Sequence, residues 1–332
     1  MSSASNRATE SPSDDQVIEV SKDFFFEGMT LPANIYIKMN PNNYLLIGKK
    51  GDKAAFSNLH AFKKDEFGVY VNKLEYAVLI QQVTLITSKV LEQKTIPDSV
   101  KVRFLTSLTD DAMSSLKTSG FSSVAKIQKV SQLVTQMSQQ VNAFNDILDI
   151  LKSLPNDDAK HVMTTCMIAM LLCEEMNVNL PQAQEKVAMG ALLHDVGLKF
   201  VPKEILEKPK HLLTPDEVQI YEQHPLKSVE MLRDIKDVPQ DVLFIVAEHH
   251  ENAQGTGFPK KLRDIKISPL GKIVGLADLF SELLFNQKPE GKSFTPDEAV
   301  TYIDDILGQP FNKQTFLALK NIINKKHLAD KS

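Results

Sequence analysis

The chain has 332 residues, a length that suggests two or more domains. Its net charge is −4 and it contains no run of basic residues, which argues against a nucleic-acid partner. No apolar stretch approaches the ~20 residues that a membrane-spanning helix needs, so we expect a cytoplasmic protein without a membrane partner. Residues 1–15 are rich in Ser and lack the apolar core of a signal peptide, and we expect a disordered tail.

Short runs of aromatic and β-branched residues, separated by turn formers, predict a small β-rich domain over residues 16–95. The runs are Val17–Val20, Phe24–Phe26, Ile35–Lys38, Tyr44–Ile47 and Val69–Val71. This region contains no cluster of catalytic residue types, so we expect it to be regulatory or sensory.

Residues 96–153 are expected to form a helical linker. Within it, apolar residues recur at positions 127, 130, 134, 137, 141, 144, 148 and 151, which is the spacing of a heptad. Two interpretations stay open. The segment 127–151 is either one long helix that forms the seam of a homodimer, or a helix packed along its own domain.

Residues 154–332 are predicted to form an all-α bundle, so the fold class is α+β overall, with a small β-containing domain before a helical one. Two segments, Thr214–Glu217 and Thr295–Glu298, have the sequence of a capping box with Pro at the first helical position. Cys166 and Cys173 would lie about 10 Å apart on one helix, too far for a disulfide, which fits reduced thiols in the cytoplasm.

The pair His194-Asp195 ends an apolar run, where it is a poor core element but a good metal ligand pair. Further ligand types follow and precede it in the predicted bundle. Together the candidate metal ligands are His161, His194, Asp195, His224, His249, His250 and Asp278. Five imidazoles and two carboxylates are sufficient for two ions that share one carboxylate, and the absence of thiolates disfavours a structural zinc site.

Six motifs in this order resemble the HD-GYP domain, a branch of the HD superfamily, over residues 157–290. They are His161, His194-Asp195, His224-Pro225, His249-His250-Glu251, Gly255-Thr-Gly-Phe-Pro259 and Ala277-Asp278. The resemblance implies a phosphodiesterase that hydrolyses cyclic di-GMP to pGpG or GMP. It also implies two divalent ions as cofactors, with iron expected first and manganese or zinc open.

Carried over residue by residue, the resemblance assigns His161, His194, Asp195 and Asp278 to one ion. Asp195 would bridge to a second ion held by His224, His249 and His250, and a metal-bridging hydroxide would attack the phosphate. Glu251 would orient the neighbouring histidines. Asp157 stands where some members of the family hold a third ion.

The sequence departs from the family on the substrate side. Leu198 occupies the position of a family lysine, and Lys199 follows one residue later. Phe258 replaces the tyrosine of the loop and Gln254 an aspartate, while Lys288 would stand for a phosphate-binding arginine. The residues assigned to catalysis are Asp195 and Lys199, and those assigned to substrate binding are Gly255, Gly257, Phe258 and Lys288.

Three functions therefore remain open. The first is hydrolysis of cyclic di-GMP, with activity weakened by these departures. The second is an impaired module that senses cyclic di-GMP or docks a partner, such as a cyclic di-GMP synthase, through the loop 254–259. The third is another phosphohydrolase of the HD type.

Overall fold

The structure is a computed structural model, which describes residues 12–21, 24–25, 29–53, 68–93, 95–119, 121–139, 144–154, 158–235, 237–285 and 293–329. The chain divides into two compact units, Met1–Ile96 and Pro97–Ser332. Predictions were also made for Asp157, Lys288 and residues 1–11, and these residues lie outside the part of the chain that the structure describes. None of the described helices combines the length and the apolar character needed to cross a membrane.

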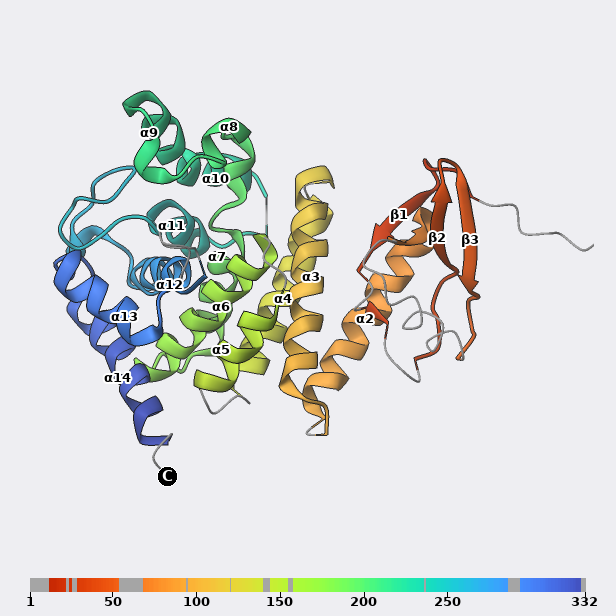
Figure 1. Ribbon diagram of the computed structural model, residues 1–332, viewed down its shortest axis with the longest axis horizontal. Helices are drawn as coiled ribbons and strands as arrows, with labels where there is room; N and C mark the ends of the chain where they lie inside the picture. The colour runs from red at the N-terminus through yellow and green to blue at the C-terminus, as the bar shows by residue number, and fades with distance from the viewer. Residues whose placement is uncertain are drawn as a thin grey trace, which may run out of the picture. The chain divides into compact units, whose positions relative to one another are not determined.

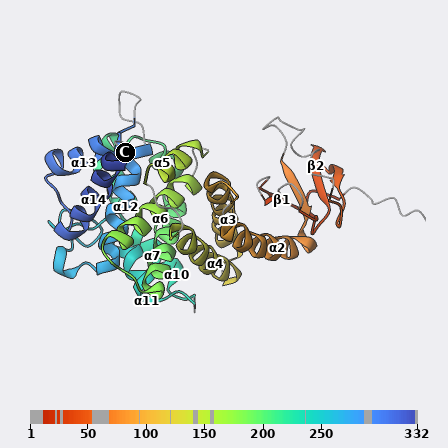
Figure 2. The same cartoon turned by 90° about the horizontal axis from the view of Figure 1, so that it is seen from below.

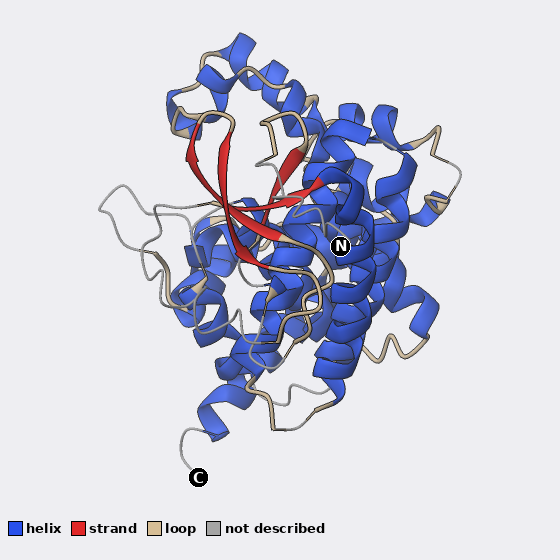
Figure 3. Ribbon diagram, turned by 90° about the vertical axis from the view of Figure 1, so that its right-hand side faces the viewer, coloured by secondary structure: helices blue, strands red, loops and turns tan. Residues whose placement is uncertain are grey.

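The first unit contains one four-stranded antiparallel sheet with the strand order β1-β4-β2-β3 (Figure 3). Its elements are β1 (Val17–Val20), β2 (Ile35–Asn40), β3 (Asn43–Gly48), β4 (Val69–Asn72) and α2 (Lys73–Glu92). Four of the five predicted runs form these strands, whereas Phe24 and Phe25 are buried without joining the sheet. Asn72 caps α2, because its side chain accepts a hydrogen bond from the backbone N–H of Leu74.

Ser13–Asp15, which were expected to belong to a disordered tail, form with Gln16 a turn beside the β2–β3 hairpin. Asp14 accepts a hydrogen bond from the Tyr44 hydroxyl at 2.7 Å, and Lys38 Nζ lies 3.0 Å away. These two side chains and the backbone of Asn42 lower the pKa of the Asp14 carboxyl to about 2. The acidic residue is therefore held by the sheet and is not part of a free tail.

The second unit is helical apart from its loops. Its helices are α3 (Asp98–Ser119), α4 (Phe121–Ser138), α5 (Phe144–Ser153), α6 (Asp158–Glu175), α7 (Pro181–Leu193), η2 (Val196–Phe200), α8 (Lys203–Leu206), η3 (Lys210–Leu212), α9 (Pro215–Glu222), α10 (His224–Leu232), α11 (Gln240–Glu248), η4 (Asp264–Lys266), α12 (Pro269–Phe285), α13 (Pro296–Thr301), η5 (Tyr302–Ile306) and α14 (Lys313–Ala329). Both predicted capping boxes are present, at the starts of α9 and α13.

Helix α6 lies between α12 and α3 in both views of the unit (Figures 1 and 2). Helices α8, α9 and α10 lie together at one end of this unit (Figure 1). The sheet followed by a helical unit confirms the α+β fold class. Cys166 and Cys173 are free and buried in α6, as predicted.

The heptad segment 127–151 is not one long helix. Helix α4 ends at Ser138 and α5 begins only at Phe144. Ile127, Val134 and Leu151 are fully buried within the second unit, where α4 packs against α3 and α7. At these described positions the heptad spacing therefore reflects packing inside this unit. Residues 97–153 accordingly belong to the helical unit and do not form a linker before it.

Candidate metal centre

Three of the predicted histidines are fixed by the last turn of a helix. Nδ1 of His194 lies 2.7 Å from the carbonyl of Ala191 in α7, Nδ1 of His224 lies 2.7 Å from the carbonyl of Tyr221 in α9, and Nδ1 of His249 lies 2.8 Å from the carbonyl of Val246 in α11. Carbonyls in the last turn lack an intrahelical partner. Because a carbonyl only accepts, each Nδ1 donates its proton to the carbonyl, and Nε2 is the nitrogen left to face the rest of the site, where it could bind a metal.

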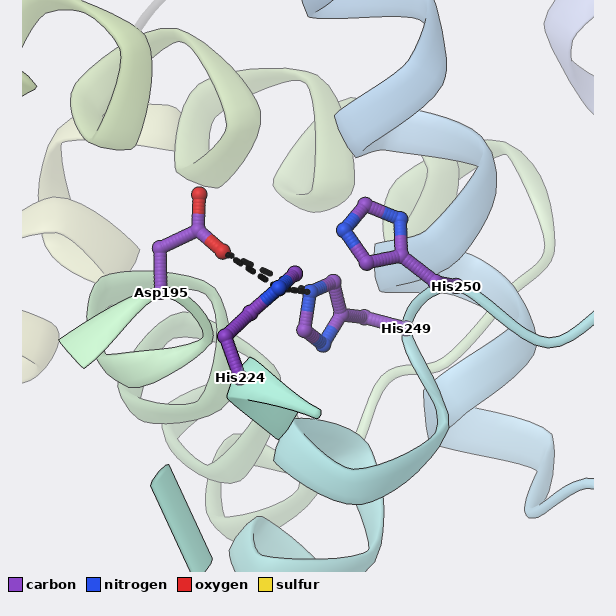
Figure 4. Close-up of side chains that lie close together, drawn as sticks. All are labelled: Asp195, His224, His249 and His250. Atoms are coloured by element: carbon purple, nitrogen blue, oxygen red, sulfur yellow. Dashed lines mark hydrogen bonds and ion pairs between the residues drawn. The ribbon is translucent and has the colours of Figure 1, made fainter. Parts of the chain in front are cut away.

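The carboxylate of Asp195 separates these histidines into two groups. Its Oδ2 lies 3.2 Å from Nε2 of His194 and 3.8 Å from Nε2 of His161. Its Oδ1 lies 3.2 Å from Nε2 of His224 and 3.5 Å from Nε2 of His249 (Figure 4). One carboxylate thus faces a pair of imidazole nitrogens with each oxygen, as a carboxylate shared by two ions does.

Asp278, from α12, completes the arrangement on the other side. Its Oδ1 lies 3.1 Å from Nε2 of His161 and 3.5 Å from Nε2 of His194, while its Oδ2 lies 3.5 Å from Nδ1 of His250. All seven predicted ligands thus meet in one place, and we call these residues the ligand cluster: His161, His194, Asp195, His224, His249, His250 and Asp278. His194, His224, His249 and Asp278 are almost completely buried.

The unpaired atoms of the ligand cluster fit divalent ions. Oδ1 of Asp195 and Nε2 of His250 are buried without a hydrogen-bond partner among the described residues, which is costly unless a ligand satisfies them. Burial lowers the pKa of His250 well below its usual value, so the imidazole stays neutral. Burial acts to raise the pKa of Asp195, but His194 outweighs it and holds that pKa well below its usual value. Neutral imidazole and ionised carboxylate are the forms that coordinate metal.

A close contact between η2 and α10, which the motifs did not reveal, joins the two halves of the ligand cluster. Ser228 is fully buried, accepts a hydrogen bond from the backbone N–H of Gly197 at 2.8 Å and donates one to the carbonyl of His194 at 3.1 Å. A Cβ on Gly197 would lie 2.2 Å from the carbonyl oxygen of His224. Only glycine permits this approach, which sets the His194-Asp195 turn against His224.

The loop 254–259 covers the His250 side of the ligand cluster. The ring of Phe258 lies 4.4 Å from that of His250 between centroids, and the backbone N–H of Phe258 donates to the His250 carbonyl. Gly255 has φ +75, a conformation that favours glycine. Glu251 does not orient the histidines as expected: its carboxylate accepts the backbone N–H groups of Lys260 and Leu262, because these unpaired donors of the loop face it.

A cavity of about 530 Å³ opens beside the ligand cluster and is lined in part by His161 and Asp195. Leu198 and Lys199 both line it, so Lys199 reaches the same space from an exposed position. Three further lining residues, Lys210, Tyr221 and Glu282, were not identified from the sequence. They lie in three different elements, η3, α9 and α12, and no motif spacing connects them.

Residues 127–312 match the HD domain family. The chain belongs to the HD domain family. A cyclic di-GMP phosphodiesterase of Pseudomonas aeruginosa, PA4108, is 28% identical over 190 residues, which cover 57% of this chain and 45% of the relative. The cyclic di-GMP phosphodiesterase PdeB of Borreliella burgdorferi is 30% identical over 164 residues, or 49% of this chain and 41% of the relative. These similarities confirm the HD-GYP-type domain that the order of motifs predicts.

Another relative, 3'3'-cGAMP-specific phosphodiesterase 3 of Vibrio cholerae, is 28% identical over 135 residues, or 41% of this chain and 29% of the relative. The chain spans about half the length, or less, of the curated relatives it matches. Among solved structures, Bd1817, a HDG"Y"P protein from Bdellovibrio bacteriovorus, is similar with a TM-score of 0.70 and 18% identity, covering 93% of this chain and 99% of that one. The similarity to this solved structure supports the fold alone.

Proposed function

We propose that the chain is a metal-dependent phosphodiesterase that hydrolyses cyclic di-GMP to pGpG or GMP. The observation that carries the proposal is the position of Asp195, whose two carboxylate oxygens face different histidine pairs at 3.2 to 3.8 Å. The names of the relatives in Pseudomonas and Borreliella supply the reaction and the substrate. Relatives named for 3'3'-cGAMP leave the choice of the second base open.

In this proposal, His161, His194 and Asp278 hold one divalent ion, His224, His249 and His250 hold the other, and Asp195 bridges them. Iron is the expected metal, and manganese and zinc accept the same ligands. When bound, such ions lower the pKa of water and neutralise charge on a phosphate. Backbone carbonyls hold three of these imidazoles, His194, His224 and His249, through Nδ1, so their rings are oriented before substrate arrives.

The cavity wall and the neighbouring loop 254–259 would supply the contacts to substrate. Lys199 lines the cavity, where its ammonium would pair with a phosphate oxygen of the dinucleotide. Phe258 presents an aromatic face next to His250, on which a base or ribose would pack. Gly255 and Gly257 give the loop its shape: a Cβ on Gly257 would lie 2.3 Å from the carbonyl oxygen of His250. We assign these two glycines to the loop backbone and not to direct substrate contacts.

A second candidate is a module that holds metal and binds the dinucleotide with little turnover. Two side chains favour it: Leu198 puts an apolar group in the cavity beside Asp195, and Phe258 provides no hydroxyl donor above His250. A docked synthase at the loop is not part of this candidate. Phe258 faces the imidazole, and Gln254 donates to the carbonyl of Gly308, so these side chains are engaged within the unit.

The two candidates differ in turnover. Full-length protein purified without oxygen would be supplied with iron or manganese and assayed with cyclic di-GMP, with chromatography of pGpG and GMP as the readout. The first candidate predicts product that disappears when a chelator removes the metal. Binding of cyclic di-GMP without product would favour the second. Product from other phosphate esters, with none from cyclic dinucleotides, would favour a general HD-type phosphohydrolase.

A further inference from the structure

One ion pair spans the cavity wall between elements that are far apart in sequence. Nζ of Lys210, in η3, lies 2.6 Å from Oε1 of Glu282, in α12, and 72 residues separate them. Both side chains line the cavity that Asp195 also lines. Lys210 Nζ also lies over the ring of Tyr221, 5.3 Å from its centroid, which holds the ammonium at the wall.

The pair presents a definite order of hydrogen-bonding groups. The ammonium of Lys210 is a donor, and the two oxygens of Glu282 beside it are acceptors. Oε1 of Glu282 contacts Lys210, while Oε2 forms no hydrogen bond with any residue that the structure describes. The Glu282 side chain is 23% exposed, so an occupant of the cavity can reach it. The wall therefore offers one donor and, next to it, a carboxylate with two acceptor oxygens.

We propose that Lys210 and Glu282 select the base of the bound nucleotide by forming hydrogen bonds to the Watson–Crick edge of guanine. That edge carries the O6 acceptor followed by the N1–H and N2–H donors. These groups complement the donor of Lys210 and the two acceptor oxygens of Glu282. Adenine presents a donor at N6 and a lone pair at N1, so its N1 would face a carboxylate oxygen. The inference rests on the proposed cyclic dinucleotide substrate and adds the residues that choose its base.

The size of the cavity agrees with this assignment. About 530 Å³ lies within the range of pockets that enclose one small-molecule ligand, so the cavity suits one nucleotide half of the substrate. Asp195 and His161 line the same cavity and place the phosphate end near the ligand cluster. The Lys210 side chain is 55% exposed, so solvent screens the pair and its removal is expected to affect binding far more than folding stability.

The test compares the affinities of GMP and AMP for the metal-loaded, full-length chain. Wild-type protein is expected to bind GMP more tightly than AMP by at least about tenfold. Glu282→Gln is expected to weaken GMP binding by about tenfold to a hundredfold, the usual range for one bidentate base contact, and AMP binding by less than about threefold. Lys210→Met, which removes the donor to O6, supplies a second variant with the same expected direction.

The matched control is Glu207→Gln. Glu207 pairs with Lys203 at 3.3 Å on α8, in the same segment of the chain, and neither residue lines the cavity. This variant is expected to leave the affinities for GMP and AMP unchanged. Melting temperature and metal content of each variant report whether the ligand cluster has been preserved.

Reversing the pair separates base selection from simple bridging. Lys210→Glu combined with Glu282→Lys restores an ion pair across the wall but inverts the order of donor and acceptors. If the pair selects guanine, the preference for GMP stays lost in this double variant. Recovery of the preference would show that the pair acts only as a bridge between η3 and α12, and would overturn the inference.

The binding and hydrolysis measurements together distinguish a failure of base selection from a failure of the proposed reaction. Selective binding of GMP that Glu282→Gln abolishes, in a protein that hydrolyses no cyclic dinucleotide, would refute the reaction and support base selection. Equal affinities of wild-type protein for GMP and AMP, or equal losses for both in Glu282→Gln, would refute base selection whatever the turnover. With active protein, the ratio of kcat/KM for cyclic di-GMP and cyclic di-AMP should follow the ratio of the affinities.

Discussion

The ligand cluster and the cavity wall beside it differ in what holds their side chains. In the cluster, His194, His224 and His249 are buried, and each is tied to a carbonyl in the last turn of the helix that precedes it. On the wall, Lys199 is exposed and Lys210 is held by another side chain. Backbone carbonyls therefore fix these three histidines of the ligand cluster, whereas a side-chain contact holds Lys210 on the cavity wall. Substitutions on the wall should therefore alter substrate handling and leave metal binding intact.

The largest effect is expected from Asp195→Ala, which removes the carboxylate that faces both histidine pairs. Hydrolysis of cyclic di-GMP should fall by at least about a thousandfold, because the shared ligand is lost from both sides at once. The measurement is kcat/KM under metal-saturating conditions. Asp241→Ala, which removes an exposed carboxylate on α11, is the control and should retain activity. Comparable activity in Asp195→Ala would contradict the bridging assignment.

The next effect is expected from Gly197→Ala, which forces a methyl group against the carbonyl of His224. Overpacking of this kind costs about 1–3 kcal/mol, so the melting temperature should fall by several degrees. The affinity for metal should fall as well, because His194 and His224 can no longer approach. Phe200→Ala, on the same turn at a side chain that is 54% exposed, should change neither property. An unchanged metal affinity in Gly197→Ala would show that the turn and α10 adjust independently.

Five of the seven predicted ligands, His194, Asp195, His224, His249 and His250, lie in short motifs at a helix end, whereas His161 and Asp278 lie within α6 and α12. In motifs such as His194-Asp195 and His249-His250, neighbouring residues already place two side chains close together. The order of these motifs along the chain was therefore enough to select them as candidate ligands. The pair Lys210 and Glu282 was not predicted, since only the packing of η3 near α12 brings it together. Ser228 was missed for the same reason: nothing in its local sequence marks a serine buried against another turn.

The heptad at 127–151 shows a different limit of prediction from sequence spacing. A dimer seam and a helix face buried within one domain both place apolar residues three and four positions apart. The spacing therefore could not decide between them, and it did not reveal that α4 ends at Ser138. The order of the strands could not be predicted either, because it depends on β4 inserting between β1 and β2 after a long connection.

A smaller effect is expected from Phe258→Ala, which removes the ring next to His250. The KM for cyclic di-GMP should rise by about tenfold, within the range of one base–aromatic stacking contact, while metal content should stay the same. The control is Ile265→Ala, because the Ile265 side chain is 93% exposed beyond the loop. Loss of metal from Phe258→Ala would place the loop with the ligand cluster and would break the distinction between cluster and wall.

The most direct test of the account is the metal content of the full-length chain, purified without oxygen and measured by elemental analysis. Six candidate ligands around the shared carboxylate of Asp195 predict two divalent ions per chain. His194→Ala, which deletes one of the buried nitrogens, should lower that content. Less than one ion per chain in wild-type protein, or an unchanged content in His194→Ala, would contradict the central claim that these residues form a binuclear centre.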